Sequence, residues 1–422
     1  VGVMKKALFV SVWQPTRSGA AQSGLYRRLS IMIDAIKKNY SLIEALFYLQ
    51  PDSENLAGNQ VQEIEQNLSQ LWGVNVRVSL CPRLESRNAS SVYDYCKSST
   101  SFFRLPGYRE LSGQSQVAAF EDCLTRNPDV VFIHRLQCMA PLMLSQKALP
   151  PVFFDLDDIE HVAMLRHLSQ PPHWWRKNLA YLYLPALLWG ERQAIKLSKA
   201  TFVCSETDQN KVASLFRTKN VVAIPNAVPL PNVTDPSPEP RILMLGNYEY
   251  APNRLGAEFF LDQVWPSISS AFPAAEVVFA GHKVEAIQHY AHPPQGVLFP
   301  GFVDDLEDLY KKIRIVICPI LSGGGTRVKI MEAAAYGRPV VSTTMGAEGI
   351  DLIDQREVLL SDTPENFASN CVKLLLDYQA ARLIGVAARK AIELKYDRDK
   401  IVAKVAGMSS HGMKDAKAAT CS

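Results

Sequence analysis

Ile317-Cys-Pro-Ile-Leu-Ser-Gly-Gly-Gly-Thr-Arg-Val-Lys-Ile-Met-Glu332 is the stretch that decides the fold. Its first part belongs to the mostly apolar run 314–319, which predicts a short strand buried on both faces. Three consecutive glycines, residues 323–325, then allow positive φ angles and a close approach of the backbone to a ligand. From Thr326 onward, apolar residues recur at three- and four-residue spacing, which predicts a helix. Strand, glycine loop and helix in this order are typical of an α/β protein.

The start of the predicted helix is a candidate anion site. Unpaired N–H groups and the positive end of the helix dipole favour a phosphate or a diphosphate there. Lys329 and Glu332 are three residues apart and therefore lie on one face of the helix. An ammonium group can offset phosphate charge, and a carboxylate can accept both hydrogens of a ribose diol. This pattern indicates a nucleoside diphosphate. The alternative is a tight turn before an ordinary amphipathic helix, with Lys329 and Glu332 as a surface pair.

The segment from Gly323 to Thr343, which ends in Gly-Arg-Pro-Val-Val-Ser-Thr, resembles a known nucleotide-sugar site. It is similar to that of the retaining glycosyltransferases with the GT-B fold, the large group often called family four, in its bacterial sugar-transferase branch. The resemblance implies an α/β protein of GT-B architecture, with two Rossmann-like domains whose parallel sheets face a central cleft. It also implies a hexosyltransferase-like enzyme that uses a nucleoside-diphosphate sugar, retains the anomeric configuration, and needs neither a metal nor a cofactor.

The resemblance also implies roles for individual residues in binding the donor. The family often carries two cations in the loop that follows residue 246, and here they are missing. Arg327 and Lys329 are therefore the expected substitutes, and Asn253 is an expected hydrogen-bonding group. Backbone groups at residues 302–303 would meet the nucleobase, and Glu332 would hold the ribose. The complete set of expected donor-binding residues is Gly19, Asn253, Phe302, Val303, Gly323, Gly324, Gly325, Thr326, Arg327, Lys329 and Glu332.

Length, composition and charge limit the class of protein. With 422 residues the chain is long enough for two or three domains, and 47% hydrophobic with 21% charged residues is typical of a globular protein. A formal net charge of +3 is too small to indicate a nucleic-acid partner. The eight cysteines lack the spacing of metal ligands. No apolar run reaches the roughly 20 residues that span a bilayer, and no signal-type segment is recognised, so we expect a cytoplasmic protein.

A proline-rich segment indicates the division into domains. Residues 229–240 carry five prolines, which predicts a stiff, extended linker. Residues 1–228 are expected to form a Rossmann-like domain on the acceptor side, and residues 241–395 a Rossmann-like domain that binds the nucleotide sugar. Residues 396–422 are expected to form a crossover helix that returns to the first domain, followed by a frayed tail.

The run from Val152 to His161 delivers several acids at the end of a predicted strand. Asp155, Asp157, Asp158 and Glu160 would repel one another without a partner, which favours a functional role. Asp155-Leu-Asp157 has the form of the Asp-x-Asp that holds a divalent metal in the GT-A fold. In the GT-B family this strand commonly ends with a histidine in the sugar pocket, and Asp157 stands in its place. The candidate catalytic residues are therefore Asp157, Asp158 and His161.

An aromatic and basic segment follows this acidic run in the sequence. Trp174, Trp175, Arg176 and Lys177 precede a mostly apolar run, and such a segment could dock at a membrane interface, as a lipid-linked acceptor would require. In this interpretation the protein would lie peripherally at the inner face of the membrane. The alternative is a buried helix that is interrupted at Pro185.

These observations lead to one preferred function and two alternatives. The preferred function is transfer of a sugar from a nucleoside-diphosphate sugar to a glycan, lipid-linked or small-molecule acceptor, as in bacterial polysaccharide biosynthesis. The first alternative is a nucleotide-sugar epimerase of GT-B fold, which needs acid and base groups in place of an acceptor. The second is a two-lobed binding protein without chemistry.

Overall fold

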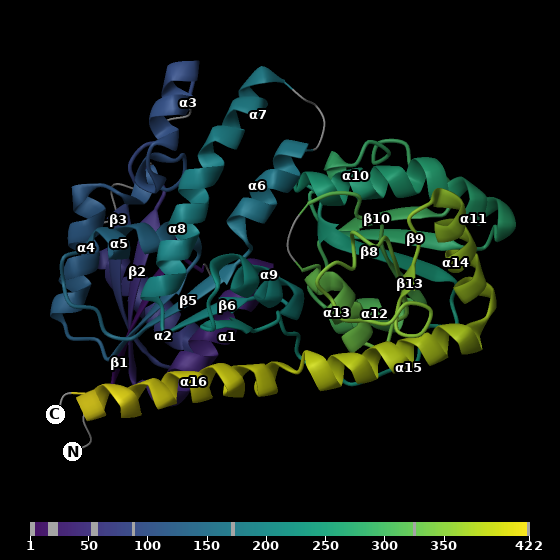
Figure 1. Cartoon of the computed structure of the whole chain (residues 1–422). Helices are drawn as coiled ribbons and strands as arrows, with labels where there is room; N and C mark the ends of the chain where they lie inside the picture. The colour runs from purple at the N-terminus through teal and green to yellow at the C-terminus, as the bar shows by residue number, and fades with distance from the viewer. Residues whose placement is uncertain are drawn as a thin grey trace. The chain divides into compact units, whose positions relative to one another are not determined.

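The computed structural model describes residues 5–15, 24–51, 58–86, 89–169, 174–323 and 326–419 (Figure 1). Three residues predicted to bind the donor, Gly19, Gly324 and Gly325, lie outside these described residues. The chain divides into two compact units, which are described separately. Unit 1 comprises Val1–Pro225 and Asp399–Ser422, and unit 2 comprises Asn226–Arg398.

A parallel sheet forms the centre of unit 1, in the strand order β3-β2-β1-β4-β5-β6-β7. Each described strand pairs in parallel with its neighbours, for example Ala7 of β1 with Ile43 of β2 and with Val130 of β4. The strands are short apolar runs, as expected of strands covered on both faces. Their bounds are β1 Lys6–Ser11, β2 Leu42–Leu49, β3 Asn75–Pro82, β4 Val130–His134, β5 Val152–Asp157, β6 Ala200–Val203 and β7 Val221–Ala223.

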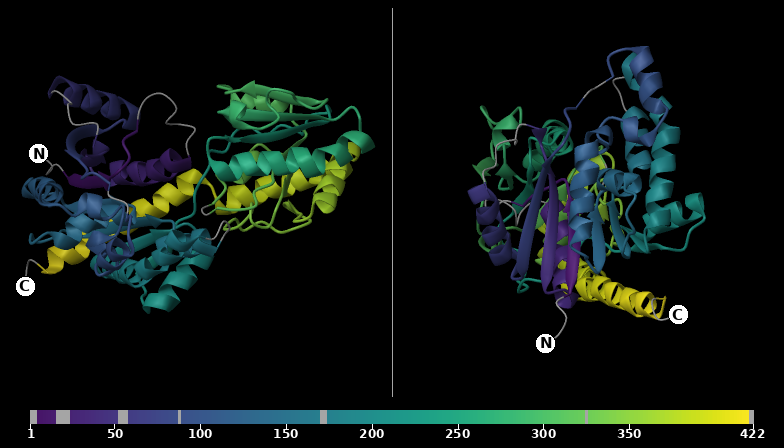
Figure 2. Two further views of the ribbon diagram at one scale, coloured as in Figure 1. Left: turned by 90° about the horizontal axis from the view of Figure 1, so that it is seen from above. Right: turned by 90° about the vertical axis from the view of Figure 1, so that its left-hand side faces the viewer.

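Helices cover both faces of this sheet, as the right-hand view of Figure 2 shows. A buried apolar core that includes Leu8, Ile133 and Phe154 lies between the sheet and the helices of one face. The α-helices are α1 Gly24–Asn39, α2 Gly58–Trp72, α3 Val92–Ser99, α4 Gln114–Thr125, α5 Met139–Leu144, α6 Glu160–Ser169, α7 Trp175–Leu179, α8 Leu184–Leu197, α9 Glu206–Phe216 and α16 Arg398–Ala419. Short 3-10 turns are η3 Phe102–Arg104, η4 Arg109–Leu111, η5 Leu136–Cys138 and η6 Ala180–Tyr183.

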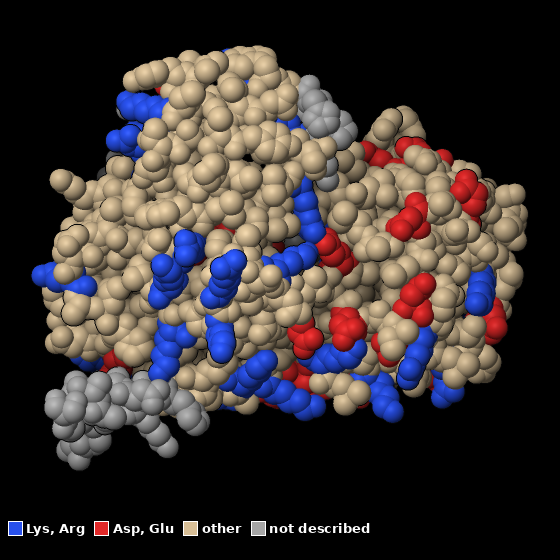
Figure 3. All heavy atoms as spheres, viewed as in Figure 1, with Lys and Arg blue, Asp and Glu red and all other residues tan. Residues whose placement is uncertain are grey.

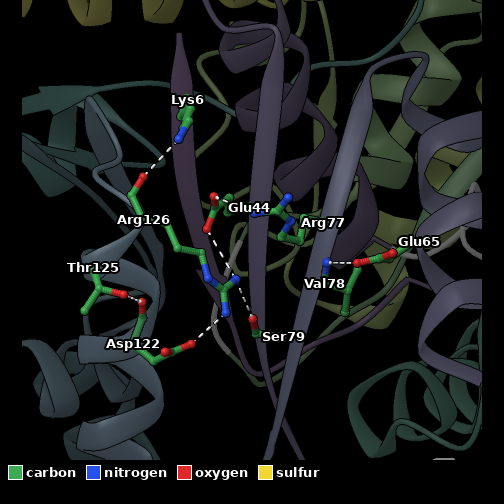
Figure 4. A network of polar contacts seen from close by, with 9 residues as sticks. All are labelled: Lys6, Glu44, Glu65, Arg77, Val78, Ser79, Asp122, Thr125 and Arg126. Carbon is green, nitrogen blue, oxygen red and sulfur yellow. Dashed lines mark hydrogen bonds and ion pairs between the residues drawn. The ribbon is translucent and has the colours of Figure 1, made fainter. Parts of the chain in front are cut away.

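A buried charge network ties α4 to the sheet of unit 1 (Figure 4). Glu44 of β2 is 1% exposed, and Arg126 at the end of α4 donates to its Oε2 at 3.4 Å. The same guanidinium donates to Ser79 Oγ at 3.1 Å and pairs with Asp122 at 2.6 Å. Since a buried carboxylate without a cation is costly, this network fixes the end of α4 over β2 and β3.

Unit 2 contains a second parallel sheet, in the order β10-β9-β8-β11-β12-β13. Its strands are β8 Arg241–Asn247, β9 Glu276–His282, β10 Val297–Gly301, β11 Ile315–Cys318, β12 Val340–Ser342 and β13 Leu359–Leu360. Its helices are α10 Ala251–Phe259, a π-helical turn η7 Phe260–Val264, α11 Trp265–Ala271, the 3-10 turn η8 Val284–Ala286, α12 Leu306–Lys311, α13 Val328–Ala335, α14 Pro364–Leu376 and α15 Tyr378–Lys395. Buried residues such as Ile242, Phe260 and Ile317 form its core.

The proline-rich segment 229–240 is held against unit 2 by buried arginines. Arg314 Nε donates to the carbonyl oxygen of Ser237 at 2.8 Å, and Arg338 Nη1 donates to that of Thr234 at 2.6 Å. Prolines lack the N–H that a sheet ladder requires, so carbonyl groups of this segment are satisfied by side chains instead. The segment is therefore counted with unit 2 in the structure.

The last helix, α16, packs on unit 1. Asn39 Nδ2 donates to the carbonyl oxygen of Ala406 at 2.7 Å and to Ser409 Oγ at 2.9 Å. Residues from Ser409 onward were expected to fray; α16 is helical to Ala419, and residues 420–422 lie outside the described residues. The alanines and lysines of this segment are good helix formers, which explains the longer helix. Within the described part of the chain, no helix is long and apolar enough to cross a membrane.

Candidate functional site

Strand ends of unit 2 bring the predicted donor-binding residues to one edge of its sheet. Because β8, β9 and β11 are parallel, the loops that follow them leave at the same edge, where ligands of open α/β sheets bind. Asn247 ends β8, His282 ends β9, and the glycine loop follows β11. Asn247 and His282 are neighbours across the sheet.

Two glycines allow neighbouring groups to approach one another closely at this edge of the sheet. Gly281 has a φ of +126°, and a Cβ atom there would lie 1.9 Å from the carbonyl oxygen of Gly246. A Cβ atom at Gly246 would lie 3.2 Å from Asn253 Nδ2 and 3.3 Å from Lys329 Nζ. Neither position therefore accepts a larger residue without movement of its neighbours.

Lys329 occupies the space beside these glycines. Its ammonium donates to Asn253 Oδ1 at 2.8 Å, and Asn253 Nδ2 in turn donates to the carbonyl oxygen of Asn247 at 2.8 Å. Burial lowers the pKa of Lys329; Cys318 acts in the opposite direction, and Arg327 lowers the pKa further. Because the amide of Asn253 is neutral, this hydrogen bond does not cancel the charge of the ammonium. Such a group can receive an anion.

The glycine loop and the start of α13 lie next to this lysine. Gly323 has a φ of +106°, and a Cβ atom there would lie 3.1 Å from both Arg327 Nη2 and the hydroxyl of Tyr250. Arg327 also donates to the carbonyl oxygen of Ser322 at 3.4 Å, and among the described residues no side-chain cap is found at the start of α13. Arg327 and Lys329 thus flank the positive end of a helix, where the N–H groups of Val328 and Ile330 donate to the carbonyl oxygens of Thr326 and Arg327.

Four further predicted residues lie in α13, just before it, or in the loop after β10. Glu332 is in the second turn of α13, with 7% of its side chain exposed. Phe302 stacks in a tilted arrangement on His282, with ring centroids 4.4 Å apart, and Val303 packs against the core. Thr326 Oγ1 would lie 3.4 Å from a Cβ atom at Gly349. A chain of contacts from Lys329 through Asn253, Asn247 and His282 thus reaches the Phe302 ring.

In unit 1, the acid run follows β5, and its first acid has a structural partner. Asp155 and Arg28 are 3% and 1% exposed, and a guanidinium nitrogen of Arg28 lies 2.5 Å from Asp155 Oδ1. Arg28 also donates to the carbonyl oxygen of Ile224. The partner that the acid run requires therefore comes from α1. Asp155 is engaged in this ion pair and is not free to join Asp157 in an Asp-x-Asp metal pair.

Asp157 lies in a strained turn at the end of β5. Its φ is +60°, and Arg135, at the end of β4, has a φ of +70°. For residues other than glycine such backbone angles cost about 1–3 kcal/mol each and are found at functional sites. Arg135 Nη2 lies 3.3 Å from Asp157 Oδ2, and Cys204 Sγ donates to Oδ1 at 3.3 Å. Burial would raise the pKa of Asp157, but Arg28 and Arg135 together lower it.

His134 is fully buried beside this turn. Its Nδ1 lies 3.1 Å from Ser11 Oγ, and its Nε2 has no hydrogen-bond partner among the described residues. Burial lowers the pKa of His134 to about 3; Arg135 and Arg28 act in the same direction, and Asp157 opposes them. The imidazole is therefore neutral, and its contact with Ser11 is a structural hydrogen bond.

His161 and Glu160 begin α6 and face α8. Glu191 of α8 is fully buried, its Oε2 lies 2.5 Å from His161 Nδ1, and its Oε1 accepts from the backbone N–H of His161 at 3.1 Å. Burial raises the pKa of Glu160 to about 7; Asp158, Glu191 and Asp157 raise it further, and Arg135 opposes them. Asp158 thus lies within electrostatic range of Glu160.

Several residues of this group could not be selected from the sequence. Arg135, Glu160 and Glu191 were not among the candidates, although Glu160 stands in the acidic run. Arg135 and Glu191 lie in other segments, and only the fold brings them to the end of β5. A charged residue directly after a buried strand was the available signal for Arg135. Among the described residues, no group of three or more His, Cys, Asp or Glu is arranged to hold a metal ion.

The residues predicted to contact a membrane lie in α7 and just before it. Trp174, Trp175 and Arg176 are exposed, and the guanidinium carbon of Arg176 lies 5.1 Å from the centre of the Trp175 ring. Lys177 is 9% exposed, so its inclusion in a surface contact is wrong. Pro185 lies in the first turn of α8, directly after the 3-10 turn η6, so the α-helix is interrupted just before this proline.

Comparison with solved structures identifies the architecture. A mutant of S. aureus TarM in complex with fondaparinux, alpha-GlcNAc-glycerol and UDP matches with a TM-score of 0.64 at 11% identity, over 96% of this chain and 99% of that chain. Anabaena HepE in complex with UDP and glucose matches with a TM-score of 0.59 at 15% identity, over 96% and 99% of the two chains. The fold is GT-B. This confirms the expected α/β class with two Rossmann-like domains.

Sequence comparison matches most of unit 2 to a known family. Residues 239–377 match the model of a family described as glycosyl transferases group 1, and this segment contains Asn253, Phe302, Lys329 and Glu332. A protein described as an uncharacterized 44.6 kDa protein in the cps region of Klebsiella pneumoniae is 24% identical over 173 residues. These residues are 39% of this chain and 44% of the relative, so the match spans less than half of that protein.

Proposed function

We propose that this GT-B protein transfers a hexosyl unit from a nucleoside-diphosphate sugar to an acceptor, with retention of configuration and without a bound metal. The observation that carries this proposal is the Lys329 ammonium, held by the neutral amide of Asn253 at the start of α13. It lies within the segment that matches the glycosyl transferases group 1. A cation beside the positive end of a helix stabilises the charge of a leaving diphosphate.

The roles within unit 2 follow from the positions of its side chains. Lys329, Arg327 and the first N–H groups of α13 would stabilise negative charge that develops on the leaving diphosphate, usually the largest contribution to catalysis. Glu332 would accept hydrogen bonds from the ribose hydroxyls. The tilted pair of His282 and Phe302 rings offers a surface on which a nucleobase can stack.

The roles within unit 1 concern the transferred sugar and its acceptor. Asp157, Asp158 and His161 remain the proposed catalytic residues, and the pairing of Asp157 with Arg135 keeps that carboxyl ionised. We add Glu160, whose raised pKa lets its carboxyl exchange a proton near neutral pH. A histidine ring nitrogen and a carboxyl group are both able to contact sugar hydroxyls.

Two comparisons support the choice of donor and acceptor. The structures of TarM and HepE that match this fold contain UDP, and HepE also contains glucose. The Klebsiella relative is named for the cps region. We therefore propose a UDP-sugar as donor and a glycan or lipid-linked glycan as acceptor, in polysaccharide biosynthesis.

A binding experiment tests the donor site first. Thermal unfolding is followed with UDP, GDP, ADP and TDP at equal concentrations, because a ligand that binds the folded state raises the melting temperature. We expect UDP to stabilise most, and Glu332→Ala to reduce that stabilisation. The control is Glu307→Ala on the surface of α12, where the carboxyl is 48% exposed. If no nucleotide shifts the melting temperature, or both variants respond alike, the site assignment is wrong.

A turnover experiment separates the transferase from the alternatives. A transferase releases UDP from a UDP-sugar much faster when an acceptor glycan is present. An epimerase converts the sugar without an acceptor, which proton NMR of the nucleotide-sugar pool detects. A binding protein retains the UDP-sugar unchanged. Release that is independent of every acceptor tested, together with a new sugar epimer, would contradict the transferase.

A further inference from the structure

Unit 1 exposes a line of large apolar side chains along one continuous helical rod. The helices α7, η6 and α8 follow one another without a break and form one rod in Figure 1. Trp175, Leu182 and Trp189 are spaced seven residues apart, so they lie within about 40° of one another around the rod. Trp174 and Tyr181 adjoin the first two. We call these five residues the aromatic stripe.

The exposure of the aromatic stripe is unusual for such side chains. Its members are between 41% and 54% exposed, whereas Trp72 and Trp265 in the cores of the two units are 3% and 2% exposed. Another face of α8, with Leu187, Ala194 and Ile195, is buried, so the segment is buried on one side and exposed on the other. Aromatic side chains that are gathered on one helix face and left in water mark a surface that binds something apolar.

The exposed charges on the rod itself have one sign. Residues 161–199 contain six lysines and arginines and one acid, Glu191, which is buried and paired with His161. Four of the cations are exposed: Arg176, Arg192, Lys196 and Lys199. Figure 3 shows the same feature, with blue side chains over the part of unit 1 that contains α8 and α9 and few red ones among them. The partner must therefore be apolar and anionic.

A groove continues the stripe beyond Trp189. It lies between α8 and α9, has a volume of about 530 Å³, and is lined by Leu188, Trp189, Arg192, Leu215, Phe216 and Arg217. Its floor is largely apolar, and it carries an arginine on each side. An acyl chain with a phosphate headgroup has the matching distribution of apolar surface and charge.

We infer that unit 1 binds the surface of an anionic phospholipid bilayer through the aromatic stripe and its cations. Tryptophan and tyrosine favour the interface between water and lipid, and cations beside them interact with anionic headgroups. A second copy of this chain is disfavoured as the occupant, because it would present the same cations. The inference does not rest on the proposed function, since it uses a surface that includes none of the donor-binding residues.

Vesicle co-sedimentation tests this inference with the full chain. We expect binding to vesicles of phosphatidylcholine with 30% phosphatidylglycerol and little binding to phosphatidylcholine alone. The double variant Trp175→Ser/Trp189→Ser should lose most of the binding. Its control is Leu383→Ser/Leu394→Ser on α15, where both leucines are 67% exposed. Equal binding of both double variants would overturn the assignment of the surface.

Charge variants test the anionic component separately. Each exposed cation is expected to strengthen binding about fivefold, so Arg192→Gln/Lys196→Gln should weaken it about 25-fold. Lys311→Gln/Lys312→Gln on α12 is the control, because both lysines are about half exposed. Binding that is equal with and without phosphatidylglycerol would contradict an anionic lipid. Self-association that Trp175→Ser/Trp189→Ser abolishes, without vesicle binding, would show that a second copy occupies the surface.

Two measurements keep the outcomes distinct. The melting temperature of each variant shows whether it folds, and exposed positions are expected to change it little. The UDP-dependent thermal shift of each variant should equal that of the wild type. Loss of vesicle binding with an intact UDP response therefore concerns this surface alone, and loss of the UDP response concerns the proposed donor site.

Discussion

The two candidate groups of charged residues differ in how their charges are paired. In unit 2 the Lys329 ammonium rests on a neutral amide, that of Asn253. In unit 1 the acids of β5 pair with cations from other elements, Asp155 with Arg28 of α1 and Asp157 with Arg135 after β4. Unit 2 thus leaves a positive charge for a ligand to neutralise, whereas unit 1 has already neutralised much of its own.

This difference separates affinity from stability. A buried cation without an anion beside it destabilises the folded protein, because its charge has lost contact with water. Binding of an anionic ligand then stabilises the folded state. A buried ion pair, in contrast, makes each partner necessary for folding, because removal of one leaves the other charged and buried. Variants in unit 2 should therefore change ligand binding, and variants of the pairs in unit 1 should change folding.

The largest effect is expected for Arg28→Met. Asp155 would then be a buried carboxylate without its cation, and the free energy of unfolding should fall by about 3–5 kcal/mol. Urea unfolding followed by circular dichroism measures this. Lys38→Met at the exposed end of α1 is the control and should change stability by less than about 0.5 kcal/mol. A loss below about 1 kcal/mol for Arg28→Met would show that the ion pair is not what holds unit 1 together.

For Lys329→Met we expect a loss of affinity for UDP without a loss of stability. Hydrogen bonds to a charged group contribute about 1.5–3 kcal/mol, so the affinity for UDP should fall roughly 10- to 150-fold. Stability without ligand should stay equal or rise, because the buried ammonium no longer needs desolvation. Titration calorimetry with UDP, and urea unfolding without it, measure the two quantities. Lys312→Met on α12 is the control.

If Lys329→Met is strongly destabilised and yet binds UDP as well as the wild type, the expected difference between the two units is contradicted. Lys329 would then be a structural cation, and the anion site would lie elsewhere in unit 2.

The same difference explains what could be predicted from the sequence. The residues from Gly323 to Glu332 are contiguous, so their loop, their helix and their common face follow from local pattern. The helix itself begins at Val328 and not at Thr326. Parallel strands could likewise be expected from short apolar runs. The contact between Lys329 and Asn253 spans 76 residues, and the resemblance to a known family was needed to select that asparagine.

The pairs in unit 1 were beyond the reach of sequence reasoning. The acid run after β5 indicated that a cation must lie nearby, but Arg28 is 127 residues away on α1 and looks like any helix surface residue in the sequence. Glu191 is likewise 30 residues from His161 in a helix whose burial depends on packing. Residues 83–110 also could not be placed, and they form α3 and two 3-10 turns.

For His134 we expect an effect of intermediate size on the free energy of unfolding when the pH is lowered. Its pKa in the folded protein is about 3, below the ordinary value of 6.5, so the unfolded chain takes up a proton that the folded chain does not. The stability due to neutral His134 is complete above pH 6.5 and is lost as the pH falls from there. Between pH 6.5 and 5 the loss amounts to about 2 kcal/mol. His134→Gln should lack this contribution in urea unfolding at the two pH values; an unchanged pH dependence would show that His134 is charged in the folded state.

The smallest effect is expected for Glu160→Gln, and its sign is opposite. The pKa of Glu160 is raised to about 7, so its contribution to stability is complete below about pH 4.5 and is lost as the pH rises through 7. Glutamine resembles the protonated acid, and the variant should therefore gain stability over the wild type between pH 5 and pH 8. We expect a gain on the order of 1 kcal/mol, because solvent and the start of α6 favour the ionised carboxyl. Glu206→Gln, the exposed first residue of α9, is the matched control in urea unfolding. Equal responses of the two variants would mean that Glu160 is ionised at neutral pH. Unit 1 would then hold an unneutralised charge, as unit 2 does, and the comparison between them would fail.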